Sequence, residues 1–391
     1  MHHHDGQQQR AFQVRIPLRT VTPLFLAGAD PRGPAELRAA SVRGALRFWL
    51  RALAGGCYGT DQAGLQQVRD LETSVFGAAG GQQGVGASKV VVSLAGQGLK
   101  TESWQPLGQG REPGSGIDYL YWSMGQLPVR GHRLPPKQYF SPDGRFTLTL
   151  ATRPGVERTA ARDAFYHAVR ATWLLVHLGG VGARARRTAG SLGVEPERRR
   201  TPDGTIRVLP VRHLDLPFQL SPRPADAARE LEAGLTLVRS RLEALPAVNL
   251  QRPDFEVLDP DWCKIWVFGG WQGRDAWMEA VDTVGSWLRE IRGQLSTNER
   301  IVFGMPLVIP QQRTTIEPPP PYTKVERRMS PLWLTLTRTI DGSLLGVATL
   351  FMSRLLDARQ EVPAERQLER HYEHIAGCVA SLPNAVEVRY E

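Results

Sequence analysis

An α+β fold of two tandem ferredoxin-like (RRM-like) modules is the architecture that this sequence predicts. Two observations lead to it. Segments with strand and helix periodicity follow one another in the order β-α-β-β-α-β, and that order occurs twice along the 391 residues. A chain of this length also exceeds one ordinary hydrophobic core. We therefore expect two domains, over residues 1–215 and 216–391.

The first predicted module alternates strand-like and helix-like segments that have clear ends. Apolar and polar residues alternate from Phe12 to Leu18, as in a half-buried strand. Both predicted helices stop at a Gly-Gly pair, which is a common helix terminator. The predicted elements are a strand over 12–26, a helix over 36–53, strands over 88–94 and 146–151, a helix over 159–178 and a strand over 189–194, with an irregular stretch over 95–143.

The second predicted module repeats this order after a Pro- and Arg-rich join over 195–225. A helix over 228–245 could belong to either side of the join. The turn Asp341-Gly342 separates the two central strands, and apolar residues in a heptad stripe mark the last helix. The predicted elements are a strand over 264–268, a helix over 275–295, strands over 331–339 and 343–350, a helix over 366–382 and a strand over 385–390.

A formal net charge of +9 predicts a polyanionic partner, with nucleic acid first among the candidates. Five of the 48 basic residues are lysines, which leaves 43 arginines. The planar guanidinium group suits bidentate contacts to phosphate. A genome rich in G and C would also favour arginine, so composition alone leaves both explanations open.

The cysteines and the apolar stretches indicate the compartment. Cys57, Cys263 and Cys378 are odd in number and far apart, which argues against a disulfide framework and for the cytoplasm. The longest apolar stretches, such as 173–178, fall far short of the roughly 20 residues that span a bilayer. We therefore expect no membrane partner.

A basic ridge follows the first predicted helix. Arg43, Arg47 and Arg51 recur every four residues, so their side chains lie along one edge beside the apolar face. Gly44 stands in the middle of this helix, where glycine is unfavourable by about 1 kcal/mol unless a backbone or a phosphate comes close. An ordinary solvated helix face is the alternative explanation of the ridge.

The segment over 178–191 is rich in glycine and arginine. Its glycines would let a ligand approach the backbone, and Arg184, Arg186 and Arg187 would neutralise phosphates. A dinucleotide-binding motif is excluded because the loop follows a helix, and a P-loop is excluded because no Gly-Lys-Ser/Thr is present. We expect these arginines to form one phosphate-binding surface with Arg43 and Arg47. The downstream run over 198–200 is equally well explained as a solvated linker.

Several strings occur in the order that is typical of one protein family. They are Thr22-Pro-Leu-Phe-Leu, the helix over 36–53, Glu72-Thr-Ser-Val-Phe-Gly77, Gly116-Ile-Asp-Tyr-Leu120, the loop over 178–191, Phe303-Gly-Met-Pro306 and Arg327-Arg-Met-Ser-Pro-Leu332. With these strings the chain resembles the RAMP-superfamily subunits of type III-B (Cmr) CRISPR effector complexes, and it is most similar to the first-numbered Cmr subunit. The resemblance is strong over the first 195 residues and weaker over 196–300.

The resemblance implies two ferredoxin-like domains without catalytic activity, cofactor or metal. It also implies a subunit that holds the 3′ region of the guide RNA, together with target RNA, for antiviral defence beside other Cmr subunits. Contacts to phosphate and sugar are expected because the guide sequence varies. The candidate RNA-binding residues are Arg38, Ser41, Arg43, Gly44, Arg47, Arg51, Gly180, Gly182, Arg184, Arg186, Arg187, Arg327 and Arg328.

Two other classes of function stay open at this point. A RAMP-type endoribonuclease that processes guide RNA or cuts target RNA would need a general base, and candidates are His132, His167, His177 and His213. Asp259 and Asp261 could cut RNA or hold a metal, but a turn before a strand explains them better. A protein scaffold that meets RNA only incidentally is the second. His371, His374 and Cys378 could share a zinc ion, but a packed helix explains them better. Tyr119, Tyr121, Trp122 and Tyr139 are candidates for contact with RNA or with a neighbouring subunit.

Overall fold

The structure is a computed structural model with two four-stranded antiparallel sheets and helices packed against them. It describes residues 11–78, 86–96, 98–106, 115–129, 132–202, 205–242, 251–296, 299–304, 307–309, 314–316, 328–354 and 368–391. The mixed α+β class that the sequence predicts is confirmed.

The first sheet has the strand order β2-β7-β1-β8. Its strands are β1 (Gln13–Thr20), β2 (Val90–Gly96), β7 (Arg145–Thr152) and β8 (Leu192–Val194). Alternate residues such as Ile16 and Leu148 are buried beneath the helices α1 (Ala39–Tyr58) and α4 (Arg158–Leu178). Arg15, Pro17 and Val91 point to the opposite face and are exposed. One face of the first sheet is therefore covered by helices, and the other is open to solvent.

The second sheet repeats this strand order as β16-β17-β13-β18. Its strands are β13 (Cys263–Trp271), β16 (Leu332–Arg338), β17 (Leu344–Phe351) and β18 (Val386–Val388). The helices α6 (Ala276–Gln294) and α8 (Leu368–Ala380) pack on one face. All eight residues of β17 are buried, which requires cover on both faces of this sheet.

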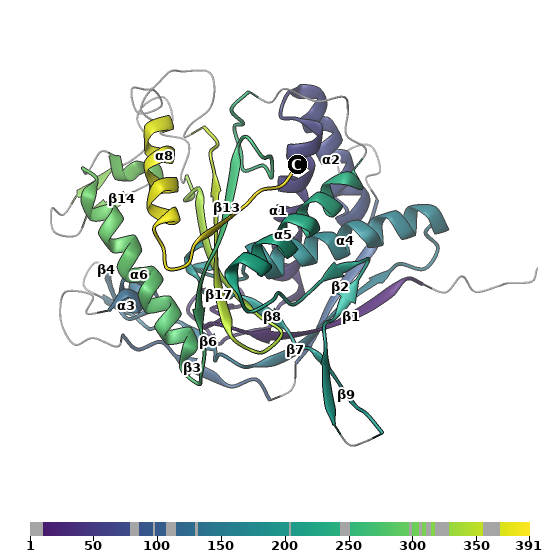
Figure 1. The fold of residues 1–391 in the computed structure, drawn as a ribbon, viewed down its shortest axis with the longest axis horizontal. Helices are drawn as coiled ribbons and strands as arrows, with labels where there is room; N and C mark the ends of the chain where they lie inside the picture. Colours follow the sequence, from purple (N-terminus) through teal and green to yellow (C-terminus); the bar gives the residue numbers. More distant parts are fainter. Residues whose placement is uncertain are drawn as a thin grey trace, which may run out of the picture.

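The opposite face of the second sheet is covered by α4 of the first half and by a helix that follows residue 215. α4 packs against β16 and β17, and α5 (Pro224–Ser240) packs against β13 and β18. Figure 1 shows β13 and β17 between α6 and α8 on one side and α1, α4 and α5 on the other. The largest core therefore joins Trp49 and Leu174 to Ile265, Trp333 and Phe351. The hydrophobic cores do not follow a boundary at residue 215.

The predicted long elements are found within a few residues of their expected bounds, but three segments differ. β1 ends at Thr20 because residues 21–26 leave the sheet, and Val21 and Phe25 enter the second core. The helix α2 (Gln62–Phe76), capped by Asp61, was not predicted. The run over 198–200 lies in a protruding hairpin, so it is not an irregular linker (Figure 1).

Short elements occupy the remaining described segments. In the first half they are β3 (Thr101–Ser103), α3 (Gly116–Tyr121), η1 (Trp122–Met124), β4 (Leu127–Val129), β5 (His132–Leu134), β6 (Gln138–Phe140), η2 (Ala185–Arg187), β9 (Glu197–Arg200) and β10 (Ile206–Leu209). Further along the chain they are β11 (Arg212–His213), β12 (Leu216–Pro217), η3 (Glu299–Phe303), β14 (Leu307–Ile309) and β15 (Thr314–Ile316). Among the helices that the structure describes, none is long and apolar enough to cross a bilayer.

The contact between α3 and α6 depends on a glycine in each helix. A Cβ added to Gly285 would lie 2.0 Å from the carbonyl oxygen of Gly116. The Gly116 amide in turn donates a hydrogen bond to Asp282 at 2.7 Å. This contact holds α3, and η1 after it, against the second half of the chain.

Replacing Gly285 by alanine should therefore lower the free energy of unfolding by about 2–3 kcal/mol, because the two backbones must move apart. Gly377→Ala is the matched control. Gly377 is exposed in α8 and a Cβ there would meet no atom within 4 Å, so alanine should raise stability by up to about 1 kcal/mol. Urea unfolding of both variants measures the difference, and equal effects would contradict the close packing of α3 on α6.

Candidate nucleic-acid interface

The basic ridge of α1 is only partly free to meet a ligand. Arg43 and Gly44 are exposed, and a Cβ at Gly44 would meet no atom within 4 Å. Arg47 and Arg51 both donate to Oε1 of Glu72 on α2, the latter at 2.8 Å. One carboxylate thus faces two guanidinium groups, and the ridge keeps an excess of positive charge.

The first turn of α1 contributes two more candidate residues. Arg38 is its N-cap residue and lies 3.9 Å from Glu36, with a side chain that is 39% exposed. Ser41 is half-buried in the first turn. Both therefore lie on the same helix as Arg43, and Arg38 is close enough to the surface to reach a ligand.

The glycine-rich loop, which comprises residues 178–191, is fixed by close contacts to other parts of the chain. Gly182 and Gly190 have positive φ values of 90° and 65°. A Cβ at Gly182 would lie 2.4 Å from the Phe25 carbonyl oxygen, and one at Gly190 would lie 1.9 Å from that of Val181. The loop backbone therefore meets its own chain at both glycines. Gly182 is nevertheless exposed, and the approach of a ligand to it stays a prediction. Gly180 is buried.

Hydrogen bonds tie this loop to both halves of the chain. The amide of Gly190 donates to Pro23 at 2.9 Å, and the amide of Thr188 donates to Leu334 of β16 at 2.7 Å. Arg184 and Thr188 flank η2 with φ values of 63° and 67°, in the left-handed region that residues other than glycine rarely adopt. The loop therefore connects the two sheets, with backbone strain at Arg184 and Thr188.

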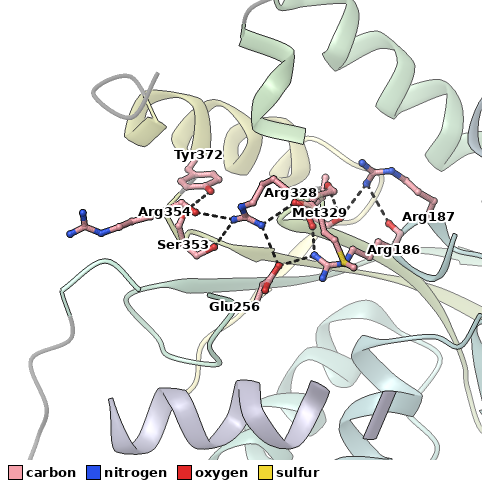
Figure 2. A network of polar contacts seen from close by, with 10 residues as sticks. Arg186, Arg187, Glu256, Arg328, Met329, Ser353, Arg354 and Tyr372 are labelled. Atoms are coloured by element: carbon pink, nitrogen blue, oxygen red, sulfur yellow. Dashed lines mark hydrogen bonds and ion pairs between the residues drawn. The ribbon is translucent and has the colours of Figure 1, made fainter. Parts of the chain in front are cut away.

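Arg186 is held inside the molecule by an acidic partner. Its Nη1 donates to Glu256 at 2.9 Å, and Arg328 approaches the same carboxylate at 3.4 Å, so that both arginines point toward Glu256 (Figure 2). The guanidinium of Arg186 also stacks on Trp333 at 4.6 Å and lies 5.5 Å from Phe48. One carboxylate thus faces two guanidinium groups, and it compensates part of the charge that was expected to neutralise a phosphate.

The electrostatic balance at Glu256 favours its ionised form. Burial raises the pKa of this carboxyl, but Arg186 and Arg328 outweigh burial and hold the pKa below its ordinary value. Arg328 also donates to Ser353 at 2.8 Å and to the carbonyl of Arg354 at 3.1 Å. Arg328 is therefore a connector between the loop and β17, and Arg327 lies outside the described residues.

Arg184 and Arg187 lie on the other side of the loop. Arg184 donates through Nε and Nη2 to Ser123, at 3.0 and 2.8 Å, and lies over Trp122 at 5.9 Å. Arg187 is buried and donates to the carbonyl of Leu332 at 3.2 Å. Burial lowers the pKa of Arg184 to about 10 and that of Arg187 to about 9, so both remain charged at neutral pH.

The five arginines that were expected to form one surface therefore have different surroundings. Arg43 is exposed on α1, Arg47 is paired with α2, and Arg186 is paired with Glu256. Arg184 lies near η1, and Arg187 is buried against the Leu332 carbonyl. The loop does pass α1, because Arg186 reaches Phe48. The contribution of each arginine to RNA binding remains a prediction.

The aromatic candidates also differ in their accessibility. Tyr121 is fully buried and hydrogen-bonds to Thr188 at 2.9 Å, so it belongs to the core. Trp122 is 48% exposed, whereas Tyr119 and Tyr139 are half-buried. Only Trp122 among these four offers a large free ring face.

The histidines that could act as a general base have structural surroundings where they are described. His177 is buried and bonds to Thr337 at 3.2 Å and to the Pro217 carbonyl at 3.1 Å. Burial lowers the pKa values of His167 and His177 to about 4, so both are neutral at pH 7. Burial also lowers the pKa of His213. Of His132 only the backbone is described, as the first residue of β5.

The other catalytic and metal candidates also have local structural explanations. Asp259 accepts a hydrogen bond from the amide of Asp261 at 3.0 Å, as in the turn that the sequence suggested. Cys378 lies 3.7 Å from His374 on α8. A search of the described residues finds no group of three side chains that could hold a metal ion.

Some of the residues that organise this region were not predicted. Glu256 pairs with arginines that are 70 and 72 residues away, and Arg292 on α6 lies 6.0 Å from the Tyr119 ring. A single acidic residue in an irregular segment and one arginine on a helix carry no local pattern. Pairwise contacts of this kind are set by the packing of the two halves.

Replacing Glu256 by glutamine should lower the free energy of unfolding at pH 7 by about 3 kcal/mol, because two buried guanidinium groups lose their counter-ion. Because the folded-state pKa of Glu256 is lowered, its contribution is present above the unfolded value of about 4.3 and is lost at lower pH. The difference between wild type and variant should therefore narrow as the pH falls below about 4. Denaturant unfolding at pH 7 and pH 3.5 measures it.

Glu197→Gln is the matched control for this experiment. Glu197 pairs with Arg199 at 3.0 Å, but both side chains are more than half exposed, so its loss should change stability by less than about 1 kcal/mol. An equal loss of unfolding free energy in the two variants would contradict a stabilising role of the ion pairs at Glu256.

Comparison with known proteins places the chain in a family. The model of the RAMP superfamily matches residues 17–193. CRISPR system Cmr subunit Cmr1-2 from Pyrococcus furiosus is 31% identical over 196 residues, which are 47% of this chain and 96% of that protein. Cmr1-1 from the same organism is 25% identical over 324 residues, 82% of each chain.

Solved structures share the fold. The apo crystal structure of Cmr1 from Pyrococcus furiosus matches with a TM-score of 0.59 and 21% identity, over 97% of this chain and 99% of that one. A chain of a type III-B Cmr-beta complex bound to cognate target RNA matches with a TM-score of 0.55 and 11% identity, over 95% and 100%. The chain belongs to the Cmr1 family of CRISPR-system subunits, within the RAMP superfamily.

Proposed function

We propose that this chain is a non-catalytic RNA-binding subunit of a type III-B CRISPR effector complex. In this role it holds the 3′ region of the guide RNA and the target RNA beside other Cmr subunits, for antiviral defence. Membership of the Cmr1 family supports the assignment to such a complex. The family relation alone does not identify the surface that binds RNA. The geometry of α1 supports an RNA-binding surface on this helix.

The observation that carries the RNA-binding proposal is the open glycine within the basic ridge. Two of the three ridge arginines, Arg47 and Arg51, share one glutamate of α2. The third, Arg43, is exposed beside Gly44, where a Cβ would meet no atom within 4 Å. A phosphodiester backbone can approach closely at a glycine, and the neighbouring guanidinium groups then neutralise its phosphates. Such contacts position RNA without reading bases, as a variable guide requires.

The repeated strand order supports a proposal about the modules. We propose that each sheet with its two helices is a ferredoxin-like module and that the modules meet near residue 215. The identical orders β2-β7-β1-β8 and β16-β17-β13-β18 support this. Because the modules share one large core, we expect them to fold together. The widely spaced cysteines, of which Cys57 and Cys263 are buried and free, support a location in the cytoplasm.

Arg43→Ala should weaken the binding of single-stranded RNA and lower the slope of log affinity against log salt by about 0.7, because one phosphate contact is lost. The loss should be nearly equal for unrelated RNA sequences. Arg162→Ala is the control, since Arg162 is an exposed helical arginine paired with Asp163 at 3.0 Å. Filter binding at several salt concentrations measures both variants. An Arg43→Ala variant with the slope and affinity of Arg162→Ala would contradict the proposed ridge.

The purified chain should leave guide precursor and target RNA intact, because His177 is held by Thr337 and Pro217 and burial lowers the pKa of His167 to about 4. Gel analysis of RNA incubated with the chain tests this. Discrete products that disappear in the His167→Ala variant would instead establish an endoribonuclease.

A further inference from the structure

Three arginines gather where the glycine-rich loop meets α6 and η1. Arg184 and Arg187 come from the loop, and Arg292 comes from α6. After burial, repulsion from Arg292 is the largest influence that lowers the pKa values of Arg184 and Arg187. The hydrogen-bond partners of these two arginines are uncharged and include the Ser123 hydroxyl and the Leu332 carbonyl. We call Arg184, Arg187 and Arg292 the arginine cluster.

The arginine cluster has no acidic partner among the residues that the structure describes. The ion pairs of the chain include both neighbouring buried arginines, Arg186 and Arg328, which share Glu256. None of the ion pairs includes a member of the arginine cluster. Withdrawing like charges from water without a counter-ion is unfavourable for folding. Because the fold nevertheless keeps these three arginines together, they are suited to bind an anionic ligand.

Hydrogen bonding within the cluster is also incomplete. The Nε atom of Arg292 is buried without a hydrogen-bond partner in the described part of the chain. Within the described ranges, Arg187 donates only through Nη1, toward two backbone carbonyl oxygens. A phosphate group offers oxygens that match these guanidinium donors in both charge and geometry.

Aromatic rings surround the arginine cluster. Arg292 lies 6.0 Å from the ring of Tyr119 and 5.6 Å from that of Phe303, and Arg184 lies over Trp122 at 5.9 Å. Trp122 is 48% exposed and is held in place because the preceding helix α3 packs against α6. An exposed indole beside unpaired cations has the two properties that bind an unpaired nucleotide, namely stacking and neutralisation of phosphate.

We propose that Arg184, Arg187 and Arg292 bind one phosphate group of single-stranded RNA, while an adjacent base stacks on Trp122. The proposal rests on the RNA-binding function proposed above and adds a second, separate contact to the ridge of α1. Single-stranded RNA is favoured over a duplex because the bases of a duplex are already stacked on one another. Free phosphate would satisfy the cations but would leave Trp122 without a role.

The Arg292→Met variant gives the most specific test. Methionine keeps an apolar side chain between Tyr119 and Phe303 but removes one of the repelling charges. Thermal unfolding of the full chain should show a higher melting temperature without ligand, and a smaller rise on addition of inorganic phosphate or a uridine hexamer. Affinity for the hexamer should fall about tenfold. Arg162→Met, at an exposed arginine of α4, is the control and should change none of these quantities.

Trp122→Ala separates the stacking contact from the phosphate contact. It should weaken hexamer binding about tenfold while leaving the thermal shift caused by inorganic phosphate unchanged. An Arg292→Met variant that melts at a lower temperature, yet binds phosphate and hexamer like wild type, would show that Arg292 is structural and would overturn the proposal. If Trp122→Ala binds the hexamer like wild type and keeps the thermal shift caused by inorganic phosphate, the stacking contact is refuted.

The failure of this proposal and that of the general function can be told apart. If Arg292→Met and Trp122→Ala bind the hexamer like wild type while Arg43→Ala binds it weakly, only the arginine cluster is refuted. If the wild-type chain binds no RNA at all, the RNA-binding function itself is refuted. A phosphate-induced rise in melting temperature that Arg292→Met abolishes would then show an anion site that does not serve RNA.

Discussion

The close approach of the glycine-rich loop to residues 21–26 and to β16 is the constraint on which the rest of the structure depends. Gly182 and Gly190 permit this approach, and the amide of Thr188 completes it with a hydrogen bond to Leu334. Once the loop is fixed there, its arginines enter the space between the two halves. The same placement lets α4 of the first half cover part of the second sheet, so folding and site formation are coupled.

This placement puts the arginines of the loop in two different environments. Arg186 turns toward Glu256 (Figure 2). Its guanidinium also lies over Trp333, and both contacts join the two halves. Arg184 donates to Ser123 of η1, and the positive charge of Arg292 on α6 repels both Arg184 and Arg187. The decisive difference between the two sides is the presence or absence of a carboxylate. A paired arginine contributes to stability, whereas an unpaired one can respond to an incoming anion.

The sequence predicted the elements that local patterns determine and missed those that depend on distant contacts. The helix over 159–178 was found at Arg158–Leu178 because its apolar face and its terminal glycines are local signals. α2 was missed because few of its residues are buried, although Asp61 gave a capping signal. The loop arginines were recognised as unusual, but Glu256, which pairs with Arg186, and Arg292, which repels Arg184 and Arg187, were not. No periodicity links residues that meet only when two halves pack together.

The central claim is that single-stranded RNA meets the chain at Trp122 beside the arginine cluster. Photo-crosslinking with an oligonucleotide that contains 4-thiouridine, followed by mass spectrometry of the peptides, tests it most directly. The account predicts crosslinks within residues 115–129, at Tyr119 or Trp122. Crosslinks confined to the hairpin of β9 and β10 (197–209) or to the open face of the first sheet would contradict it.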